Sequence, residues 1–128
     1  MREPDDFETV FTAMKRERPD ALFLVADVLT SLNRKRVIDF VAAHRIPAMY
    51  EFSFVVEDGG LMSYGASFED AYKRVAYYID RIFKGAKPAN LPVEQPSRFQ
   101  LVINLKTAKT LGLKIPDSIL LRADKLIE

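Results

Sequence analysis

The apolar residues of this chain change their spacing from one segment to the next. Between residues 7 and 14 they recur every three or four positions, which predicts a helix that Pro19 ends. Residues 21–26 (ALFLVA) then form an unbroken apolar run between two acidic residues. A run without alternation is typical of a strand covered on both faces, as in a parallel sheet. The chain is therefore expected to open with a helix and a buried strand.

The same order is expected again in the middle of the chain. Thr30 or Ser31 is positioned to cap a second helix that continues to about residue 45. Residues 46–51 (IPAMYE) predict a second strand, whose proline lies near the start, where a strand tolerates one. After a turn at a glycine pair, residues 61–64 (LMSY) predict a third strand.

The strongest helical signal lies between Ser67 and Gly85. Ser67 and Asp70 resemble a capping box, and Gly85 stands where a left-handed C-terminal cap belongs. Between them runs a wide apolar stripe at helical spacing, which water alone should not cover. The stripe consists of Phe68, Ala71, Tyr72, Val75, Ala76, Ile79, Ile82 and Phe83.

A proline-rich connector follows this helix. Pro88, Pro92 and Pro96 predict an extended connector over residues 87–96, because proline interrupts helices and restricts the residue before it. Residues 99–103 (FQLVI) predict a fourth strand.

Two short helices are expected to complete the chain. Asn104 is expected to cap one that ends at Gly112, and Pro116 and Asp117 to open another toward Leu126. Helix and strand thus alternate through most of the sequence. This alternation predicts an α/β fold of three layers with a mostly parallel sheet.

Ligands of such sheets bind beyond the carboxyl ends of the strands. Three segments satisfy this rule, at residues 27–31, 51–54 and 64–66. Asp27 and Glu51 in these segments could cap helices, bind an ammonium group of a ligand, or act as an acid–base pair. The sequence leaves these alternatives open.

Four aromatic residues stand near the same strand ends. Such side chains either stack on a flat solute or belong to the core. We assign Tyr50 and Phe54 to the core, whereas both interpretations stay open for Phe52 and Tyr64.

Composition argues against several kinds of function. Lys and Arg total 19 against 18 Asp and Glu, a net charge of +1, which does not favour a nucleic-acid partner. The basic run at residues 34–36 is interpreted as the solvated face of a helix. With no cysteine and one histidine, His44, the chain has too few parts for a catalytic triad or a nitrogen and sulfur metal site. We therefore expect no metal, no cofactor and no catalytic set.

Three stretches carry a family resemblance: residues 59–65 (GGLMSYG), residues 82–95 (IFKGAKPANLPVEQ) and residues 99–116 (FQLVINLKTAKTLGLKIP). They resemble the C-terminal half of ABC-transporter substrate-binding proteins, in the branch with tryptophan- and tyrosine-binding members. The resemblance extends from about Phe7 to Leu126, and its gap-free register from residue 84 to residue 116 is the most specific part.

The resemblance implies the type I periplasmic-binding fold, in which crossover strands join two α/β lobes around a solute. Residues 1–128 are then one α/β domain of which residues 5–56 and 97–128 resemble the C-terminal lobe. Residues 60–88 would belong to the N-terminal lobe, and residues 88–96 would be a crossover connector.

The resemblance also implies a function and a set of contacts. A small solute such as an amino acid would be bound in the interlobe cleft, an ABC permease would be the partner in the full-length family, and no enzymatic activity is expected. The family's ligand contacts correspond here to Asp27, Thr30 and Ser31 after the first strand, and to Glu51 and Tyr64 at the ends of the next two, with Phe52 beside them.

The resemblance further implies a periplasmic or extracytoplasmic location. The charged N-terminus has no apolar h-region, so no signal peptide is expected in this chain, and the location would be cytoplasmic if Met1 is the true start. The N-terminal lobe is expected to be missing, which predicts a truncated solute-binding component.

Two further expectations concern partners and function. A homodimer is expected, through the exposed lobe surface or by exchange of residues 61–84. The alternative function is a standalone small-ligand sensor or interaction domain that no longer serves transport. An enzyme that uses Asp27 and Glu51 is a third and weaker interpretation, because no catalytic set accompanies them.

Overall fold

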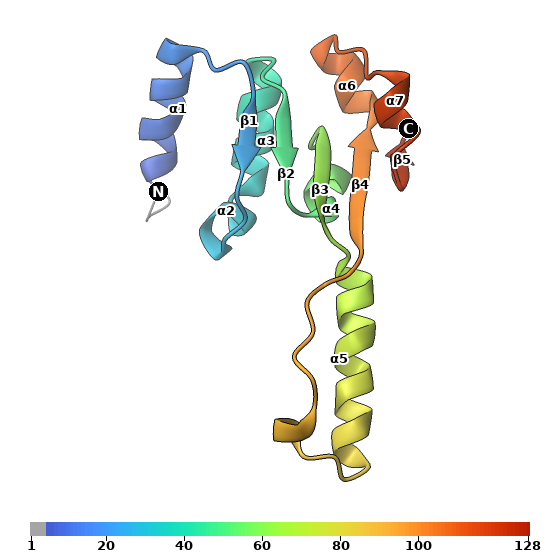
Figure 1. The fold of residues 1–128 in the computed structure, drawn as a ribbon. Helices are drawn as coiled ribbons and strands as arrows, with labels where there is room; N and C mark the ends of the chain where they lie inside the picture. The colour runs from blue at the N-terminus through green and yellow to red at the C-terminus, as the bar shows by residue number, and fades with distance from the viewer. Residues whose placement is uncertain (1–4) are drawn as a thin grey trace. The chain divides into compact units, whose positions relative to one another are not determined.

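The computed structural model describes residues 5–128, which divide into two compact units. We call the part up to Gly65 together with Gln100–Glu128 the sheet unit, and Ala66–Phe99 the helix unit. The sheet unit contains α1 (Asp6–Glu17), β1 (Leu22–Leu24), α2 (Val28–Leu32), α3 (Arg34–Ala43), β2 (Ala48–Tyr50), α4 (Ser53–Glu57), β3 (Met62–Ala66), β4 (Phe99–Asn104), α6 (Leu105–Leu111), α7 (Asp117–Leu120) and β5 (Lys125–Ile127) (Figure 1).

The five strands form one sheet in the order β1-β2-β3-β4-β5. β1, β2 and β3 run parallel to one another, and β4 and β5 run parallel to each other. The β4 arrow points against those of β1 and β2 in Figure 1, and the Asn104 amide at the end of β4 donates to the Leu61 carbonyl just before β3, at 2.8 Å. The expected α/β class with a mostly parallel sheet is therefore confirmed.

The core of the sheet unit lies where α1 and α3 pack together. Phe7 is fully buried, and the ring of Phe11 stacks on that of Phe40 with centroids 4.2 Å apart. Tyr50 of β2 is buried in the same cluster, as predicted, and its hydroxyl has no hydrogen-bond partner among the described residues. Burying each large apolar side chain is worth about 1.5–3 kcal/mol, so this cluster dominates the stability of the unit.

The first strand differs from its prediction. β1 is only three residues long and lies at the edge of the sheet. Phe23 is 56% exposed and Val25 is exposed as well, so the expectation that both faces of this run are covered was wrong. An edge strand has a neighbour on one side only, which an unbroken apolar run does not reveal.

The second predicted helix is two helices, and its predicted cap was wrong. α2 and α3 separate at Asn33, and Asp27 rather than Thr30 or Ser31 is the N-cap of α2. α4 was not predicted at all, because its five residues are too short for helical periodicity to show.

The predictions for the C-terminal part were right at its first helix and wrong at its last. The Asn104 side chain accepts a hydrogen bond from the Thr107 amide at 3.0 Å, and Gly112 ends α6 with a φ of 74°, both as expected. The predicted helix toward Leu126 stops instead at Leu120, and β5 follows.

The helix unit consists of α5 (Phe68–Phe83), a 3₁₀ turn (Pro88–Asn90) and an extended return segment. The Ser67 hydroxyl caps α5 by accepting from the Asp70 amide at 3.2 Å, and Gly85 adopts a φ of 98°, as predicted. None of the residues of α5 is buried. A strongly amphipathic helix thus presents its apolar stripe without a core of its own.

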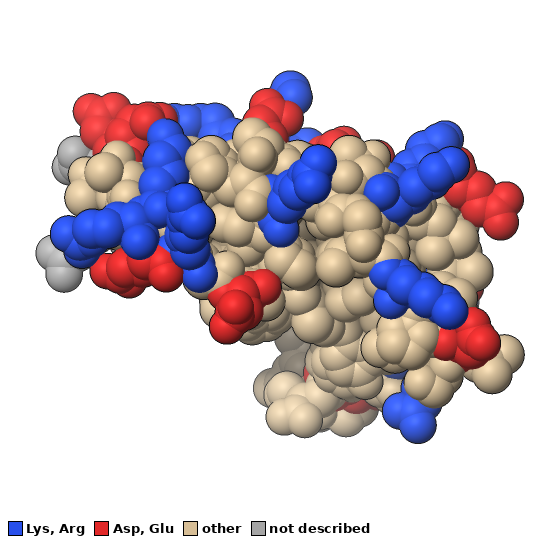
Figure 2. Space-filling view, turned by 90° about the horizontal axis from the view of Figure 1, so that it is seen from above, with Lys and Arg blue, Asp and Glu red and all other residues tan. Residues whose placement is uncertain are grey.

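Charges on the surface are mixed rather than segregated. On the face that Figure 2 shows, basic side chains lie beside acidic ones. Each member of the basic run at residues 34–36 pairs with an acid: Arg34 with Asp58 at 2.5 Å, Lys35 with Asp39 at 3.0 Å and Arg36 with Glu8 at 2.8 Å. Across residues 5–128, none of the helices combines the length and the apolar character needed to cross a bilayer.

Candidate functional site

The sheet unit is hollowed at the carboxyl ends of β1 and β2. A hollow of about 410 Å³ is lined by Ala26, Asp27, Val28, Ser31, Leu32 and Phe52. Beside it lies a narrow crevice of about 10 Å³, whose lining includes Thr30, Ser31, Glu51 and Phe52. The crevice has room for about one water molecule, whereas the hollow is of the size of a small-molecule site. Five of the six residues predicted from the sequence thus meet at one place.

Asp27 stands at the rim of the hollow as the N-cap of α2. Its carboxylate accepts the Thr30 amide at 2.7 Å, while the Thr30 hydroxyl accepts the Asp27 amide at 2.9 Å. The hydrogen bond from the Thr30 backbone lowers the pKa of the Asp27 carboxyl below its usual value. The carboxylate is therefore anionic at neutral pH, and its side chain is exposed to solvent. The capping alternative is realised, and the negative charge remains available to a ligand.

Thr30 and Ser31 share the helix but differ in exposure. Thr30 is buried, and its hydroxyl also donates to the Val25 carbonyl at 3.2 Å. Thr30 therefore fixes the loop that follows β1. Ser31 is partly exposed and lines both the hollow and the crevice, so its hydroxyl is the better placed of the two to meet a solute.

Glu51 follows β2 directly and ties the two strand ends together. One of its carboxylate oxygens accepts the Ala26 amide at 2.8 Å. Its backbone is approached closely by β3: a Cβ on Gly65 would lie 1.9 Å from the Glu51 carbonyl oxygen. Only glycine fits this contact, so Gly65 fixes the position of Glu51. The carboxylate of Glu51 thus supports the loop that carries Asp27.

The wall of the hollow is apolar. Val28 and Leu32, one turn apart on α2, are each 76% exposed, and Phe52 lies across from them in the lining. The Phe52 ring stacks on that of Phe54 at 5.5 Å between centroids. An anionic carboxylate beside exposed apolar side chains suits a solute that combines a cationic group with an apolar part.

Tyr64 lies outside this arrangement. It belongs to β3, is exposed, and lines neither the hollow nor the crevice. Its neighbour Ser63 pairs in register with Tyr50 and is buried, so Tyr64 projects from the opposite face of the sheet, because successive strand residues point to opposite faces. The role expected for Tyr64 in solute contact is not tested by this geometry.

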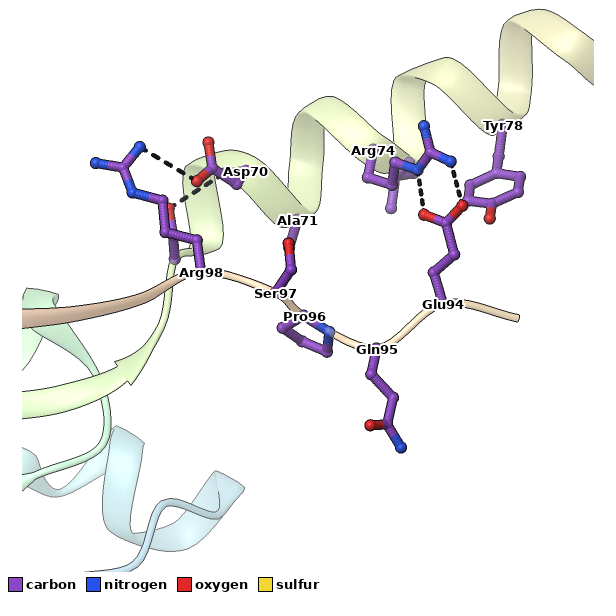
Figure 3. Close-up of a pocket in the computed structure, with 11 residues that line it drawn as sticks. Asp70, Ala71, Arg74, Tyr78, Glu94, Gln95, Pro96, Ser97 and Arg98 are labelled. Carbon is purple, nitrogen blue, oxygen red and sulfur yellow. Dashed lines mark hydrogen bonds and ion pairs between the residues drawn. The ribbon is translucent and has the colours of Figure 1, made fainter. Parts of the chain in front are cut away.

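A larger hollow, of about 640 Å³, lies in the helix unit between α5 and the return segment (Figure 3). Its charged groups are already paired: Arg74 with Glu94 through two contacts, and Arg98 with Asp70 at 3.5 Å. The Tyr78 hydroxyl donates to the Pro92 carbonyl at 2.7 Å. The sequence analysis did not identify this hollow, because residues of distant segments form it. Its polar groups have protein partners, so it offers less to a polar solute than the hollow beside Asp27 does.

Metal binding finds no support in the described part of the chain. Residues 5–128 contain no group of three or more His, Asp or Glu side chains placed to hold an ion. The single histidine, His44, instead stacks on Phe40 and places its Nδ1 2.8 Å from the Phe40 carbonyl oxygen.

Two solved structures match this chain closely in fold. An ABC domain from Streptococcus pneumoniae in complex with L-Trp shares 29% sequence identity with a TM-score of 0.87, and the match covers 99% of this chain and 44% of that one. A conserved domain protein from Vibrio cholerae shares 25% identity with a TM-score of 0.86, over 98% of this chain and 42% of that one. This chain therefore spans less than half the length of these relatives.

A more distant structure supports the fold alone. The ligand-free, open structure of a substrate-binding protein with adhesive properties from Clostridium difficile has 18% identity and a TM-score of 0.68, over 99% of this chain and 42% of that one. No curated protein matched the sequence. The family model described as ABC transporter substrate binding protein matches residues 1–127. The chain belongs to the ABC transporter substrate-binding protein family.

Proposed function

We propose that this chain is part of the solute-binding component of an ABC importer and that its solute is an amino acid or a similar small molecule. The observation that carries the proposal is the hollow at the carboxyl ends of β1 and β2, where the anionic Asp27 lies beside Val28, Leu32 and Phe52. An amino acid with an apolar side chain offers the complementary ammonium group and apolar surface. The Streptococcus pneumoniae relative, crystallised with L-Trp, supports this class of solute.

The proposed mechanism is closure of two lobes around the solute. Residues 5–56 and 97–128 would belong to one lobe, residues 60–88 to the other, and residues 88–96 would be a crossover. The division of the structure into a sheet unit and a helix unit supports this assignment. A solute with higher affinity for the closed form would shift the population toward closure. In this scheme Asp27, Thr30, Ser31, Glu51 and Phe52 form one wall of the site, and Tyr64 contributes at its margin.

The proposed setting follows from the same function. A solute-binding component delivers its cargo to an ABC permease, so we infer an extracytoplasmic location and a permease partner. A second copy of the chain is a further proposed partner, through exposed surface or exchange of residues 61–84. The alternative is a standalone sensor or interaction domain that has kept the hollow and left transport.

Catalysis is not part of the proposal. The family is defined by substrate binding. Asp27 and Glu51, the candidate acid–base pair, are each held by backbone amides, from Thr30 and Ala26. These contacts favour a structural and binding role for both carboxylates.

The substitution Asp27→Asn tests the proposal, because asparagine also caps helices well but carries no charge. We expect the fold of α2 to survive and the binding of amino acids to weaken at least tenfold, as an ammonium group loses its anionic partner. Chemical-shift changes in two-dimensional NMR, recorded while a panel of amino acids is titrated to millimolar concentration, measure this weakening.

Asp39→Asn is the matched control, since Asp39 is an exposed carboxylate on α3 that pairs only with Lys35 among the printed ion pairs. It should leave binding unchanged. If no amino acid perturbs residues around the hollow, or if Asp27→Asn binds as well as the unaltered chain, the proposed site is wrong. Micromolar binding by this chain by itself would favour the sensor alternative.

A further inference from the structure

One flank of α5 carries charges that alternate along the helix. Glu69, Lys73, Asp80 and Lys84 project to the same side, since successive members lie three to four or seven residues apart. Lys73 pairs with Glu69 at 2.6 Å and Lys84 pairs with Asp80 at 2.9 Å, which confirms that the members of each pair are neighbours. Read from the N-terminus, the flank is therefore negative, positive, negative, positive.

This order is complementary to its own reverse. When two α5 helices lie antiparallel with a two-fold axis near Ala76, Glu69 of one copy lies level with Lys84 of the other, and Lys73 lies level with Asp80. A parallel pair in register places each charge beside its like, which is unfavourable. The antiparallel arrangement also sets the positive end of each helix dipole against the negative end of the other.

The apolar stripe beside this flank is complementary in the same register. Around an axis near Ala76, Tyr72 of one copy lies level with Ile79 of the other, and Val75 lies near Val75. Tyr72 is 70% exposed and Phe83 is 85% exposed. The return segment contacts a different side of α5, through Arg74 and Tyr78, so it leaves this stripe exposed.

We propose that α5 is a self-association helix, through which two copies of this chain pair in antiparallel orientation. The proposal does not depend on solute binding, since none of the residues around the hollow beside Asp27 lies on α5. The exposed aromatic side chains bury about 150–250 Å² each when covered, whereas a standard interface buries about 800 Å² per partner. A single helix pair is therefore expected to associate weakly, in the micromolar to millimolar range.

Sedimentation equilibrium of the full chain over this range of concentration is the first test. We expect a reversible monomer–dimer equilibrium, and a strict monomer at the highest concentration would overturn the proposal. Two variants then test the charge pattern: Lys73→Glu with Lys84→Glu makes the flank wholly acidic, and Glu69→Lys with Asp80→Lys makes it wholly basic.

Each of these double variants should be monomeric when alone, and an equal mixture should dimerise at least tenfold more tightly than either. Both variants lose the same helical ion pairs, so a loss of α5 itself would appear equally in the mixture and circular dichroism would register it. Dimers of either variant alone, or a mixture that stays monomeric, would contradict pairing through this flank.

Orientation is tested by single cysteines, because the natural chain contains none. Ala76→Cys lies at the proposed axis and should form an intermolecular disulfide under mild oxidation. Ile82→Cys should not, since a rise of 1.5 Å per residue separates the two copies of that position by about 18 Å, far beyond disulfide reach. Equal cross-linking at both positions would refute the antiparallel arrangement.

Discussion

The two units of this chain use similar apolar residues in opposite ways. In the sheet unit, Phe7, Tyr50 and Ile103 are almost completely shielded from water. In the helix unit, α5 carries at least as wide an apolar stripe, and none of its residues is buried. The same composition therefore gives a self-sufficient core in one unit and a binding surface in the other. Which of the two results depends on whether neighbouring segments return to cover the apolar face.

The largest contrast is expected from matched truncations of phenylalanine. Phe7→Ala removes a fully buried ring and should lower the free energy of unfolding by about 3–5 kcal/mol, because it leaves a cavity in the core. Phe83→Ala, at an exposed position of α5, should change it by less than about 0.5 kcal/mol. Urea denaturation of dilute protein measures both. Similar losses for the two variants would mean that α5 is covered in solution and would remove the contrast.

A second contrast uses glycine in each unit. Gly65→Ala drives a Cβ into the Glu51 carbonyl oxygen, so we expect a loss of more than about 2 kcal/mol together with displacement of Glu51. Gly85→Ala meets open space and carries only the cost of a positive φ, about 1 kcal/mol. Thermal unfolding ranks the two variants, and NMR shifts of Ala26 report whether Glu51 has moved. A Gly65→Ala variant no less stable than Gly85→Ala would show that β2 and β3 separate easily.

A smaller effect is expected at the Tyr50 hydroxyl, which is buried without a hydrogen-bond partner among the described residues. Tyr50→Phe should raise the free energy of unfolding by about 1 kcal/mol, since an unpaired buried polar group is removed. Chemical denaturation at neutral pH measures this gain. A loss of stability would indicate that a water molecule satisfies the hydroxyl.

The same residue predicts a pH dependence. Burial raises the pKa of Tyr50 to about 12, so the folded state holds the phenol proton at a pH where the unfolded chain releases it. The contribution of Tyr50 to stability is complete below about pH 10 and is lost as the pH rises to about 12, by up to about 3 kcal/mol. Tyr50→Phe should lack this component, so the difference between the two proteins across this range isolates it from other titrations.

The smallest effect is expected in the helix unit, at the pair formed by Arg74 and Glu94. The hydrogen bonds from Arg74 lower the pKa of Glu94, so the pair is intact at neutral pH and is lost as the pH falls through that lowered pKa. Exposed ion pairs contribute little to global stability. Glu94→Gln should therefore speed amide hydrogen exchange in the return segment without changing the unfolding midpoint. Unchanged exchange there would show that the Tyr78 contact to Pro92 suffices to hold the segment.

The sequence predicted those elements whose signals are local. Ser67 and Gly85 bound α5, and Asn104 and Gly112 bound α6, because caps depend on residues only a few positions apart. β5 could not be found in this way. Its pairing with β4 joins Val102 to Lys125 across the intervening α6 and α7, and no local pattern records such a contact.

The candidate site shows the same division between local and distant information. Strand-end geometry was enough to bring Asp27, Ser31, Glu51 and Phe52 together as candidates. The sequence could not decide that Asp27 is a helix cap, since this required the mutual hydrogen bonds with Thr30. Nor could it show that Glu51 reaches the Ala26 amide, which lies 25 positions away in the chain.

The exposed edge of the sheet has a consequence for how this protein tolerates concentration. β1 is the terminal strand, and its free edge can template the addition of further strands from other molecules, as in fibril growth. Its three-residue length and the acidic neighbours Asp20 and Asp27 act against that outcome, since charged residues that flank a hydrophobic strand serve as gatekeepers. The carboxylate that offers a site to a solute therefore also helps to keep the molecules apart from one another.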